Sequence, residues 1–303
     1  MERLLIIYHA NCVDGFGAAF AVYSRFRQGD HCPCDFVAAV HGHPPPQATG
    51  RDVYVVDFSY PRKEMKELCR EARSVTVIDH HLTAVHDLGG LEKEHDNLRM
   101  IFEMEKSGAV LTWEYFHQSP PPALLLHVQD RDLWRLELQG TNDIHAALMA
   151  RPFDFRSWAE LAASADIPAA LVAEGQAINR YRRKMIDLHL AETVMASIAG
   201  YLVPVVNCYE EIASDLLGEL ATGHPFAAGY HDKGTLRKWS LRSSSGGVDI
   251  AEIAERFGGG GHRHAAGFMT RLPDGAMKIE PGNSGNGWCR GVSTSSEESD
   301  LLQ

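Results

Sequence analysis

Two adjacent histidines follow a short apolar run in the stretch VTVIDHHLTA, residues 75–84. A buried strand gains nothing from ending in titratable rings, so Asp79, His80 and His81 call for a chemical explanation. Neighbouring residues on a strand point to opposite faces, which would give the two imidazoles different surroundings. We expect one imidazole to bind a metal ion and the other to meet a substrate.

Three further segments place carboxylates or imidazoles directly after apolar runs. They hold His9 and Asp14 in YHANCVDGFG, Asp57 in VYVVDFSY, and Asp130 and Asp132 in QDRD. Taken one at a time, such residues are more often turn, cap or core residues. Together they form the ligand set of Mn²⁺, Fe²⁺ or Zn²⁺, and the scarcity of cysteine disfavours a structural zinc site. We therefore predict a metal cluster, in which a bridging carboxylate would let two ions act on a phosphate.

A glycine-rich segment near the end of the chain gives an independent signal. Four glycines precede three polar residues in FGGGGHRHAAGF, residues 257–268. We interpret the glycines as sites of close backbone approach to an anion rather than as packing residues. His262, Arg263 and His264 add donors suited to phosphate. The segment is therefore predicted to bind phosphate.

The elements that would position these residues alternate between strands and helices in the first half of the chain. Apolar runs predict strands at 4–8, 36–40, 53–56 and 75–78, and helical spacing covers 15–27 and 61–72. This pattern is typical of an α/β fold with a parallel sheet covered on both faces. Ligands of such sheets bind beyond the carboxyl ends of the strands, where the polar residues gather.

A long helical pattern, Ala170–His189, predicts a connector to a second α/β unit. That unit has expected strands at 201–207, 226–230, 236–242 and 265–270, with helices at 211–220 and 249–257. The expected domain ranges are 1–155, a helical linker at 156–197, and 198–280. The tail, 281–303, is rich in Gly, Ser, Asn and Glu, and this composition predicts disorder.

Composition bounds the class of protein. The chain has 303 residues, a net charge of −11 and 45% hydrophobic residues, as expected of a globular protein with two domains. The acidic charge argues against non-specific binding of nucleic acid. No apolar run approaches the roughly 18 residues of a membrane span, so we expect no membrane partner. The six cysteines lack a disulfide spacing and fit a cytoplasmic protein, with Cys32 and Cys34 as free thiols in a loop.

These motifs resemble those of a known family, the DHH phosphoesterases of the DHH–DHHA1 subgroup, which includes oligoribonucleases of the nanoRNase type. IDHH resembles the motif that names the family, GGGGHRHAAGF its glycine motif, and HANCVDGFG, VVDFSY and QDRDLW its other metal motifs. The resemblance covers about Leu4 to Phe268. It implies a parallel-sheet DHH domain joined by a long helix to a smaller α/β DHHA1 domain, with the active site in the cleft between them.

The resemblance also implies a dinuclear Mn²⁺ centre, with Mg²⁺, Co²⁺ or Fe²⁺ as alternatives. His9 and Asp14 would hold one ion, Asp57 would bridge both, and His80 and Asp130 would complete the second site. In the same way, His81 would contact the scissile phosphate and Asp79 would order the two histidines or approach the metals. The remote end of the substrate would be held by Gly259, Gly260, Gly261, His262, Arg263 and His264.

The first motif departs from the family pattern. The family has two acidic residues around a glycine, whereas Asp14-Gly15 is followed here by Phe16, and an extra residue separates His9 from Asp14. One ligand is therefore missing or substituted, and Asn11 or Cys12 could replace it. An alternative alignment puts Cys12 at the first acidic position and Asp14 at the second.

The leading functional hypothesis is a metal-dependent phosphodiesterase that acts on short single-stranded oligoribonucleotides or small nucleotides, with 3′-phosphoadenosine phosphate as an additional substrate. An exopolyphosphatase or a cyclic-dinucleotide phosphodiesterase would use the same metal centre. A third hypothesis, motivated by Phe16, is a nucleotide-binding regulatory protein with impaired catalysis. The sequence leaves open whether the protein forms a homodimer.

Overall fold

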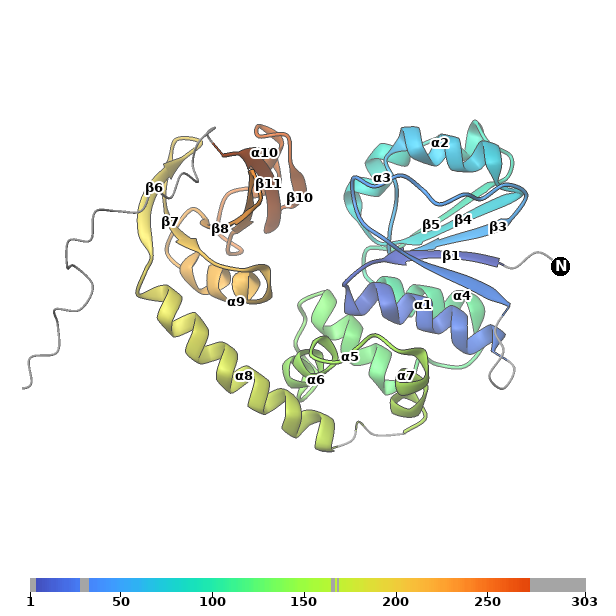
Figure 1. The fold of residues 1–303 in the computed structure, drawn as a ribbon, viewed down its shortest axis with the longest axis horizontal. Helices are drawn as coiled ribbons and strands as arrows, with labels where there is room; N and C mark the ends of the chain where they lie inside the picture. The colour runs from blue at the N-terminus through green and yellow to red at the C-terminus, as the bar shows by residue number, and fades with distance from the viewer. Residues whose placement is uncertain (1–3, 28–32, 165–166, 168, 273–303) are drawn as a thin grey trace, which may run out of the picture.

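The computed structural model describes residues 4–27, 33–164, 167 and 169–272. Figure 1 shows two α/β units joined by a long helix, α8 (Ala169–Leu190). The expected tail, the end of the expected second domain beyond residue 272, and Cys32 lie outside the described residues. Within the described part of the chain, no helix combines the length and apolar character needed to cross a bilayer.

The first unit is built on a five-stranded parallel sheet in the order β2-β1-β3-β4-β5. Its strands are β1 (Leu4–His9), β2 (Cys34–Ala39), β3 (Asp52–Val56), β4 (Ser74–Asp79) and β5 (Leu98–Phe102). The α/β parallel-sheet fold expected from the sequence is thereby confirmed. The edge strand β5 was not predicted, because Arg99 interrupts its apolar run.

Helices cover both faces of this sheet, which explains the apolar character of its central strands. On one face lie α2 (Arg62–Glu71) and α3 (Leu82–Leu88), and on the other lie α1 (Val13–Phe26) and α4 (Gly108–Phe116) (Figure 1). Alternate residues of β1 enter the two cores: Leu5 and Ile7 pack on the side of α2, and Ile6 packs on the side of α1. The short 3₁₀ helix η1 (Leu91–Lys93) precedes β5.

Three short helices lie between the first sheet and α8: α5 (Ala123–Asp132), α6 (Thr141–Met149) and α7 (Phe155–Ala162). Their core contains an aromatic group in which the ring of Phe16 stacks on Phe155 and Phe153, with centroid distances of 4.7 and 5.1 Å. The edge of Trp158 closes the group. Phe16 is therefore a core residue of the first unit.

The second unit contains a six-stranded mixed sheet in the order β10-β11-β9-β8-β7-β6. Its strands are β6 (Val194–Ile198), β7 (Tyr201–Asn207), β8 (Ala227–Lys233), β9 (Leu236–Arg242), β10 (Gly260–His262) and β11 (Ala265–Arg271). Two helices, α9 (Glu210–Leu220) and α10 (Ile250–Glu255), pack against it. Strand β6 overlaps the end of the range expected to be a helical linker, 156–197, and the helical segment ends at Leu190.

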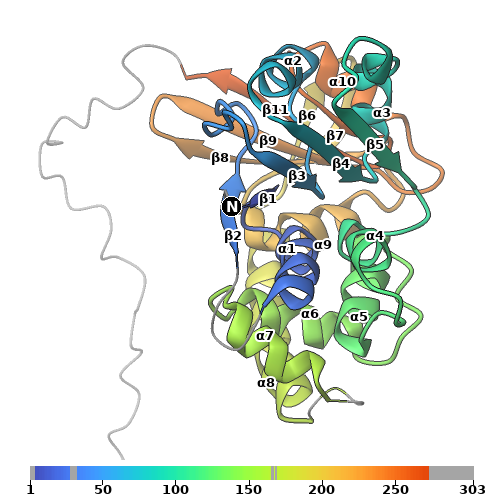
Figure 2. The same cartoon turned by 90° about the vertical axis from the view of Figure 1, so that its right-hand side faces the viewer.

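The carboxyl ends of the first sheet point toward the second unit (Figure 1), and Figure 2 shows the first unit standing in front of the second. Two of the contacts between described residues of the two units involve charged or aromatic side chains. Arg131 of α5 pairs with Asp215 of α9 at 3.3 Å, and the rings of His81 and His262 lie 5.5 Å apart. The polar strand ends therefore face β10 of the second sheet.

Candidate metal centre

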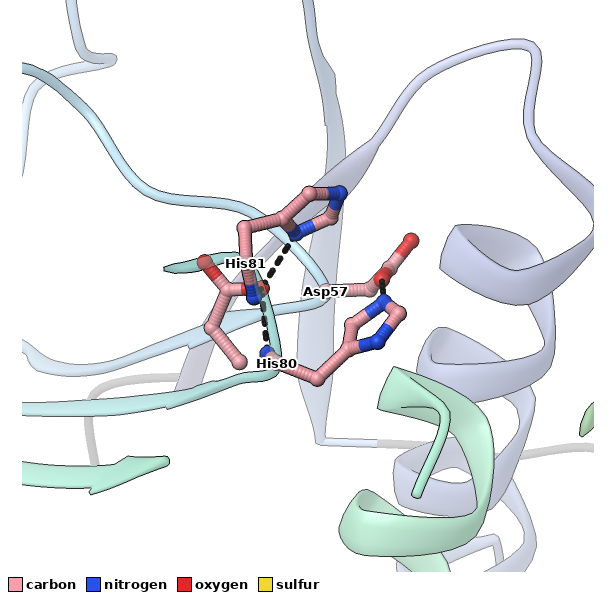
Figure 3. A group of neighbouring side chains, drawn as sticks. Asp57, His80 and His81 are labelled. Atoms are coloured by element: carbon pink, nitrogen blue, oxygen red, sulfur yellow. Dashed lines mark hydrogen bonds and ion pairs between the residues drawn. The ribbon is translucent and has the colours of Figure 1, made fainter. Parts of the chain in front are cut away.

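Asp57 lies at the middle of the strand-end cluster, immediately after β3. It is 1% exposed and adopts a left-handed backbone conformation with φ 52°, which turns its side chain across the strand ends. Its Oδ1 lies 3.1 Å from Nε2 of His80 (Figure 3). Its Oδ2 lies 3.8 Å from both Nδ1 of His9 and Sγ of Cys12. The two oxygens of Asp57 therefore face two different groups of donors.

His9, Cys12 and Asp57 form the first group, with one ligand atom from each lying within 4.8 Å of the others. His9 ends β1, and Cys12 stands at the N-cap of α1. Gly15 makes this close packing of α1 feasible, because a Cβ there would lie 2.4 Å from the His9 carbonyl oxygen. From the sequence, Cys12 is one of the two residues, with Asn11, that could replace the missing ligand.

Asp14, His80 and Asp132 form the second group, again within 4.8 Å. Nε2 of His80 lies 3.6 Å from Asp14 and 3.5 Å from Asp132, in addition to its contact with Asp57. Asp14 also accepts backbone N–H bonds from Gly108 at 2.7 Å and Ala109 at 3.0 Å, at the start of α4. The N-terminus of α4 thus fixes the Asp14 carboxylate.

Asp79 orders the two histidines. It is fully buried, and its Oδ1 accepts hydrogen bonds from the backbone N–H groups of His80 at 2.7 Å and His81 at 3.3 Å. The same oxygen lies 2.6 Å from Nδ1 of His81, and Ser59 donates to the other oxygen. Figure 3 shows the His80 ring directed at Asp57 and the His81 ring close by, with the centroids of the two rings 4.6 Å apart.

The charged groups in this cluster strongly shift one another's pKa values. Burial, followed by the charge of Asp57, raises the pKa of Asp132 to about 6 and that of Asp14 well above its usual value. Burial alone would lower the pKa of His80, but its hydrogen bond to Asp57 and the neighbouring carboxylates raise that pKa to about 10. Such an accumulation of buried carboxylates favours a bound cation.

The donor set fits two divalent ions that share Asp57. One ion could be held by His9, Cys12 and Asp57, and the other by Asp14, His80 and Asp132, with Asp57 3.1 Å from His80. Asp57, Asp79, His80 and His81 also lie within 4.8 Å of one another. The bridging role of Asp57 stays a prediction.

The structure does not bring Asp130 into either group. Its carboxylate accepts hydrogen bonds from the N–H groups of Glu137 at 2.9 Å and Leu138 at 3.0 Å, and from the Thr141 hydroxyl at 2.6 Å. Residues two apart on a helix point in different directions, so Asp132 reaches the centre while Asp130 holds the loop after α5. The acidic donor from α5 is therefore Asp132 rather than the expected Asp130.

Phe16 does not occupy a ligand position, because its side chain lies in the aromatic core. Both Cys12 and Asp14 reach the centre, whereas Asn11 is exposed. This arrangement agrees with the alignment that puts Cys12 at the first acidic position and Asp14 at the second. On that alignment, Cys12 stands where the family has an acidic residue, and Phe16 lies outside the metal motif.

The glycine segment has a different role at each position. A Cβ at Gly259 would lie 2.1 Å from the Gly267 carbonyl, and Gly261 adopts φ 143° against β11, so both glycines serve close strand packing after all. A Cβ at Gly260 would meet open space. Among the three polar residues, His262 stacks toward His81. Arg263 is mostly exposed and lies 3.7 Å from Asp249, and His264 contacts Ser243 at 3.0 Å.

Arg242 was not anticipated from the sequence. It ends β9 directly opposite Ala265, which is itself opposite His262. Directly opposed residues of antiparallel strands share a face, so Arg242 lies on the same face as His262, which faces the metal centre. Among the described residues, no carboxylate pairs with Arg242, and its guanidinium donates to the Leu241 carbonyl. Burial, followed by the charge of Arg131, lowers the pKa of Arg242.

A cavity of about 210 Å³ lies beside His81. It is lined by polar and aromatic side chains, among them His41, Phe58, Ser59 and Asp79. His81 thus borders this cavity, and its ring also stacks toward His262 of the second unit.

Comparisons with known proteins complete the description. No family model matches the chain. Its sequence is 30% identical over 308 residues to the uncharacterized protein R106 of Acanthamoeba polyphaga mimivirus, an alignment that covers 91% of this chain and 69% of R106.

Several solved structures are similar in fold, two of them with a TM-score above 0.5. RecJ of Thermus thermophilus, solved in complex with Mn²⁺, superposes with a TM-score of 0.52 at 15% identity, over 90% of this chain and 50% of RecJ. The DHH domain of a member of the s1p family of ribosomal proteins gives a TM-score of 0.51 at 13% identity, over 89% of this chain and 83% of that one. At these identities the likeness concerns the fold, which is that of DHH proteins.

Proposed function

Because the chain belongs to the same family as the mimivirus protein R106 and has the fold of DHH proteins, we propose that it is a metal-dependent phosphoesterase. The observation that carries the proposal is the position of Asp57 between two groups of donors. A buried carboxylate shared by two such groups suits a two-metal centre. Imidazole and carboxylate donors together suit Mn²⁺, Fe²⁺ or Zn²⁺, and among these we propose Mn²⁺, the ion in the RecJ complex.

Divalent ions bound in this centre would polarise a phosphate group and activate water as the nucleophile. The residues of the chain position the substrate for that attack. His81 has its Nδ1 engaged by Asp79, which leaves Nε2 to donate to a phosphate oxygen. Burial alone would lower the pKa of His81, but the Asp79 carboxylate raises it and so favours the protonated donor. A donor aimed at charge that develops in the transition state accelerates the reaction.

The proposed substrates are short oligoribonucleotides or small nucleotides, including 3′-phosphoadenosine phosphate. His262 and Arg242 lie on the face of the second sheet that is turned to the centre, so they would hold an anionic group remote from the reacting phosphate. The net charge of −11 opposes the binding of long polymers. An exopolyphosphatase or a cyclic-dinucleotide phosphodiesterase would use the same residues. A nucleotide-binding regulatory protein with impaired catalysis is also compatible with the fold, but the position of Phe16 in the aromatic core does not favour it.

The decisive experiment compares substrates on one metal-loaded preparation. Purified protein with Mn²⁺ is incubated with di- to pentaribonucleotides, 3′-phosphoadenosine phosphate, cyclic dinucleotides and polyphosphate. We expect mononucleotide release from the oligoribonucleotides, and none from an Asp57→Asn variant. Hydrolysis of only polyphosphate, or of only cyclic dinucleotides, would show that the substrate belongs to that class and not to the oligoribonucleotides. A protein that binds Mn²⁺ and hydrolyses none of these compounds would refute the enzymatic proposal.

A further inference from the structure

The metal centre contains one sulfur donor, and its placement is specific. Sγ of Cys12 lies 3.8 Å from Oδ2 of Asp57, in the group that includes His9. The other described cysteines, Cys34, Cys69 and Cys208, are buried in the cores. Cys12 is therefore the thiol that the fold directs into the proposed centre.

Local backbone geometry explains how Cys12 reaches this position. Asn11 adopts a left-handed conformation with φ 54°, so the chain turns sharply between His9 and α1. Cys12 itself is extended at the N-cap of α1, where a side chain commonly accepts an N–H bond from the helix. The Cys12 thiol faces the backbone N–H of Gly15 in the first turn of α1 and at the same time reaches Oδ2 of Asp57.

The two donor groups around Asp57 differ in chemical softness. One contains a thiol and an imidazole beside the carboxylate, and the other contains two further carboxylates and an imidazole. Soft thiolate ligands favour Zn²⁺ and other late divalent ions over Mn²⁺, whereas carboxylates suit Mn²⁺ and Mg²⁺. The centre therefore offers two unequal sites.

We infer that Cys12 binds the ion held by His9 and Asp57 as a thiolate, which makes this site selective for Zn²⁺, Co²⁺ or Fe²⁺ over Mn²⁺. The thiol proton is released as the sulfur–metal bond forms. The site of Asp14, His80 and Asp132 keeps a preference for harder ions, so the centre is suited to two different metals. The inference rests on the proposed metal centre but not on the identity of the substrate.

Cobalt titration tests the sulfur ligand directly. Metal-free full-length protein is titrated with Co²⁺, and the near-ultraviolet sulfur-to-cobalt charge-transfer band is followed together with the visible bands and the metal content. We expect the charge-transfer band to saturate at one equivalent. It should be absent from Cys12→Asp, which supplies a carboxylate and still binds Co²⁺. Cys69→Ala is the matched control, because its thiol lies in the core on α2, and this variant should keep the band.

Competition between Zn²⁺ and Mn²⁺ provides a second readout. The preference of the first site for Zn²⁺ should fall at least about tenfold in Cys12→Asp, because a hard oxygen replaces the soft sulfur. Wild-type protein that binds Co²⁺ without the charge-transfer band would overturn the role of Cys12 and leave the metal-dependent enzyme standing. A charge-transfer band that persists in Cys12→Asp would likewise show that Cys12 is not the sulfur ligand. A protein that binds no divalent ion would overturn both proposals.

Discussion

Gly108 packs so closely on Asp57 that a methyl group on its Cα would lie 2.4 Å from the Asp57 Cβ. The N–H of Gly108 also donates to Asp14. Gly108→Ala should displace Asp57 or α4, and we expect a loss of Mn²⁺ affinity of at least about tenfold, about 1.4 kcal/mol. Isothermal titration calorimetry measures it. Gly218→Ala on α9 is the control, because its new methyl group meets open space. Unchanged affinity in Gly108→Ala would show that the centre tolerates the shift.

Substitutions of the two acidic residues of α5 should have different effects, one on metal affinity and the other on thermal stability. Asp132→Asn removes a donor from the centre, so Mn²⁺ affinity should fall while thermal stability of the metal-free protein is retained or raised. Asp130→Asn weakens hydrogen bonds to a charged group, each worth about 1.5–3 kcal/mol, so stability should fall while metal affinity persists. Thermal unfolding and calorimetry of both variants separate the two roles. Loss of metal in Asp130→Asn alone would restore the assignment made from the sequence.

The two adjacent histidines should also be distinguishable. His80→Ala should lose metal, and excess Mn²⁺ should restore part of the activity by mass action. His81→Ala should retain metal but lose kcat by about 10²–10³-fold, since it removes a donor to the developing charge. Metal analysis and steady-state kinetics measure both effects. Full metal content in both variants would contradict the ligand role of His80.

Metal binding should depend on pH. The pKa of His80 in the metal-free protein is raised to about 10, so below that pH the ring carries a proton that a metal ion must displace. Apparent Mn²⁺ affinity should therefore rise from pH 6 to pH 9. Below about pH 6, protonation of Asp132 should steepen the decline. Calorimetry in buffers of different ionisation enthalpy counts the protons released. An affinity that is flat over this range would contradict the charge coupling around Asp57.

Substrate affinity should depend on Arg242 and much less on Arg263. Arg242 shares the face of His262, whereas Arg263 is exposed beside Asp249. Arg242→Ala should raise KM about tenfold to a hundredfold with kcat little changed, as expected for a charge-assisted contact away from the reaction. Arg263→Ala is the control and should leave KM within about threefold. The reverse ranking would return the anion contact to the glycine segment.

The central strands of the first sheet were predictable because strands buried on both faces need continuous apolar runs. The polar residues that end β1, β3 and β4 were informative for the same reason, since nothing in the core requires them. Edge strands carry a weaker signal, and β5 was missed. Strand β10 was missed because it begins with glycines, whose contribution is close packing against β11.

The direction of individual side chains could not be predicted from the sequence as the central strands could. The choice between Asp130 and Asp132 depends on the rotation of α5, which is fixed by tertiary packing. The placement of Cys12 depends on the left-handed turn at Asn11. Arg242 gave no signal, because its proximity to His262 arises from pairing between strands that are distant in sequence.

The contact between Arg131 and Asp215 has a consequence for the movement of the two units. Asp215 is also bound by Arg182 at 2.8 Å, so one carboxylate of α9 ties α5 of the first unit to α8. The guanidinium of Arg131 lies 3.9 Å from the ring centroid of Trp134, which holds it in place. The Arg131 side chain is 10% exposed and that of Asp215 is 35% exposed, so dissolved salt screens this pair much less than a pair on the open surface. The contact between the two units should therefore persist at moderate ionic strength.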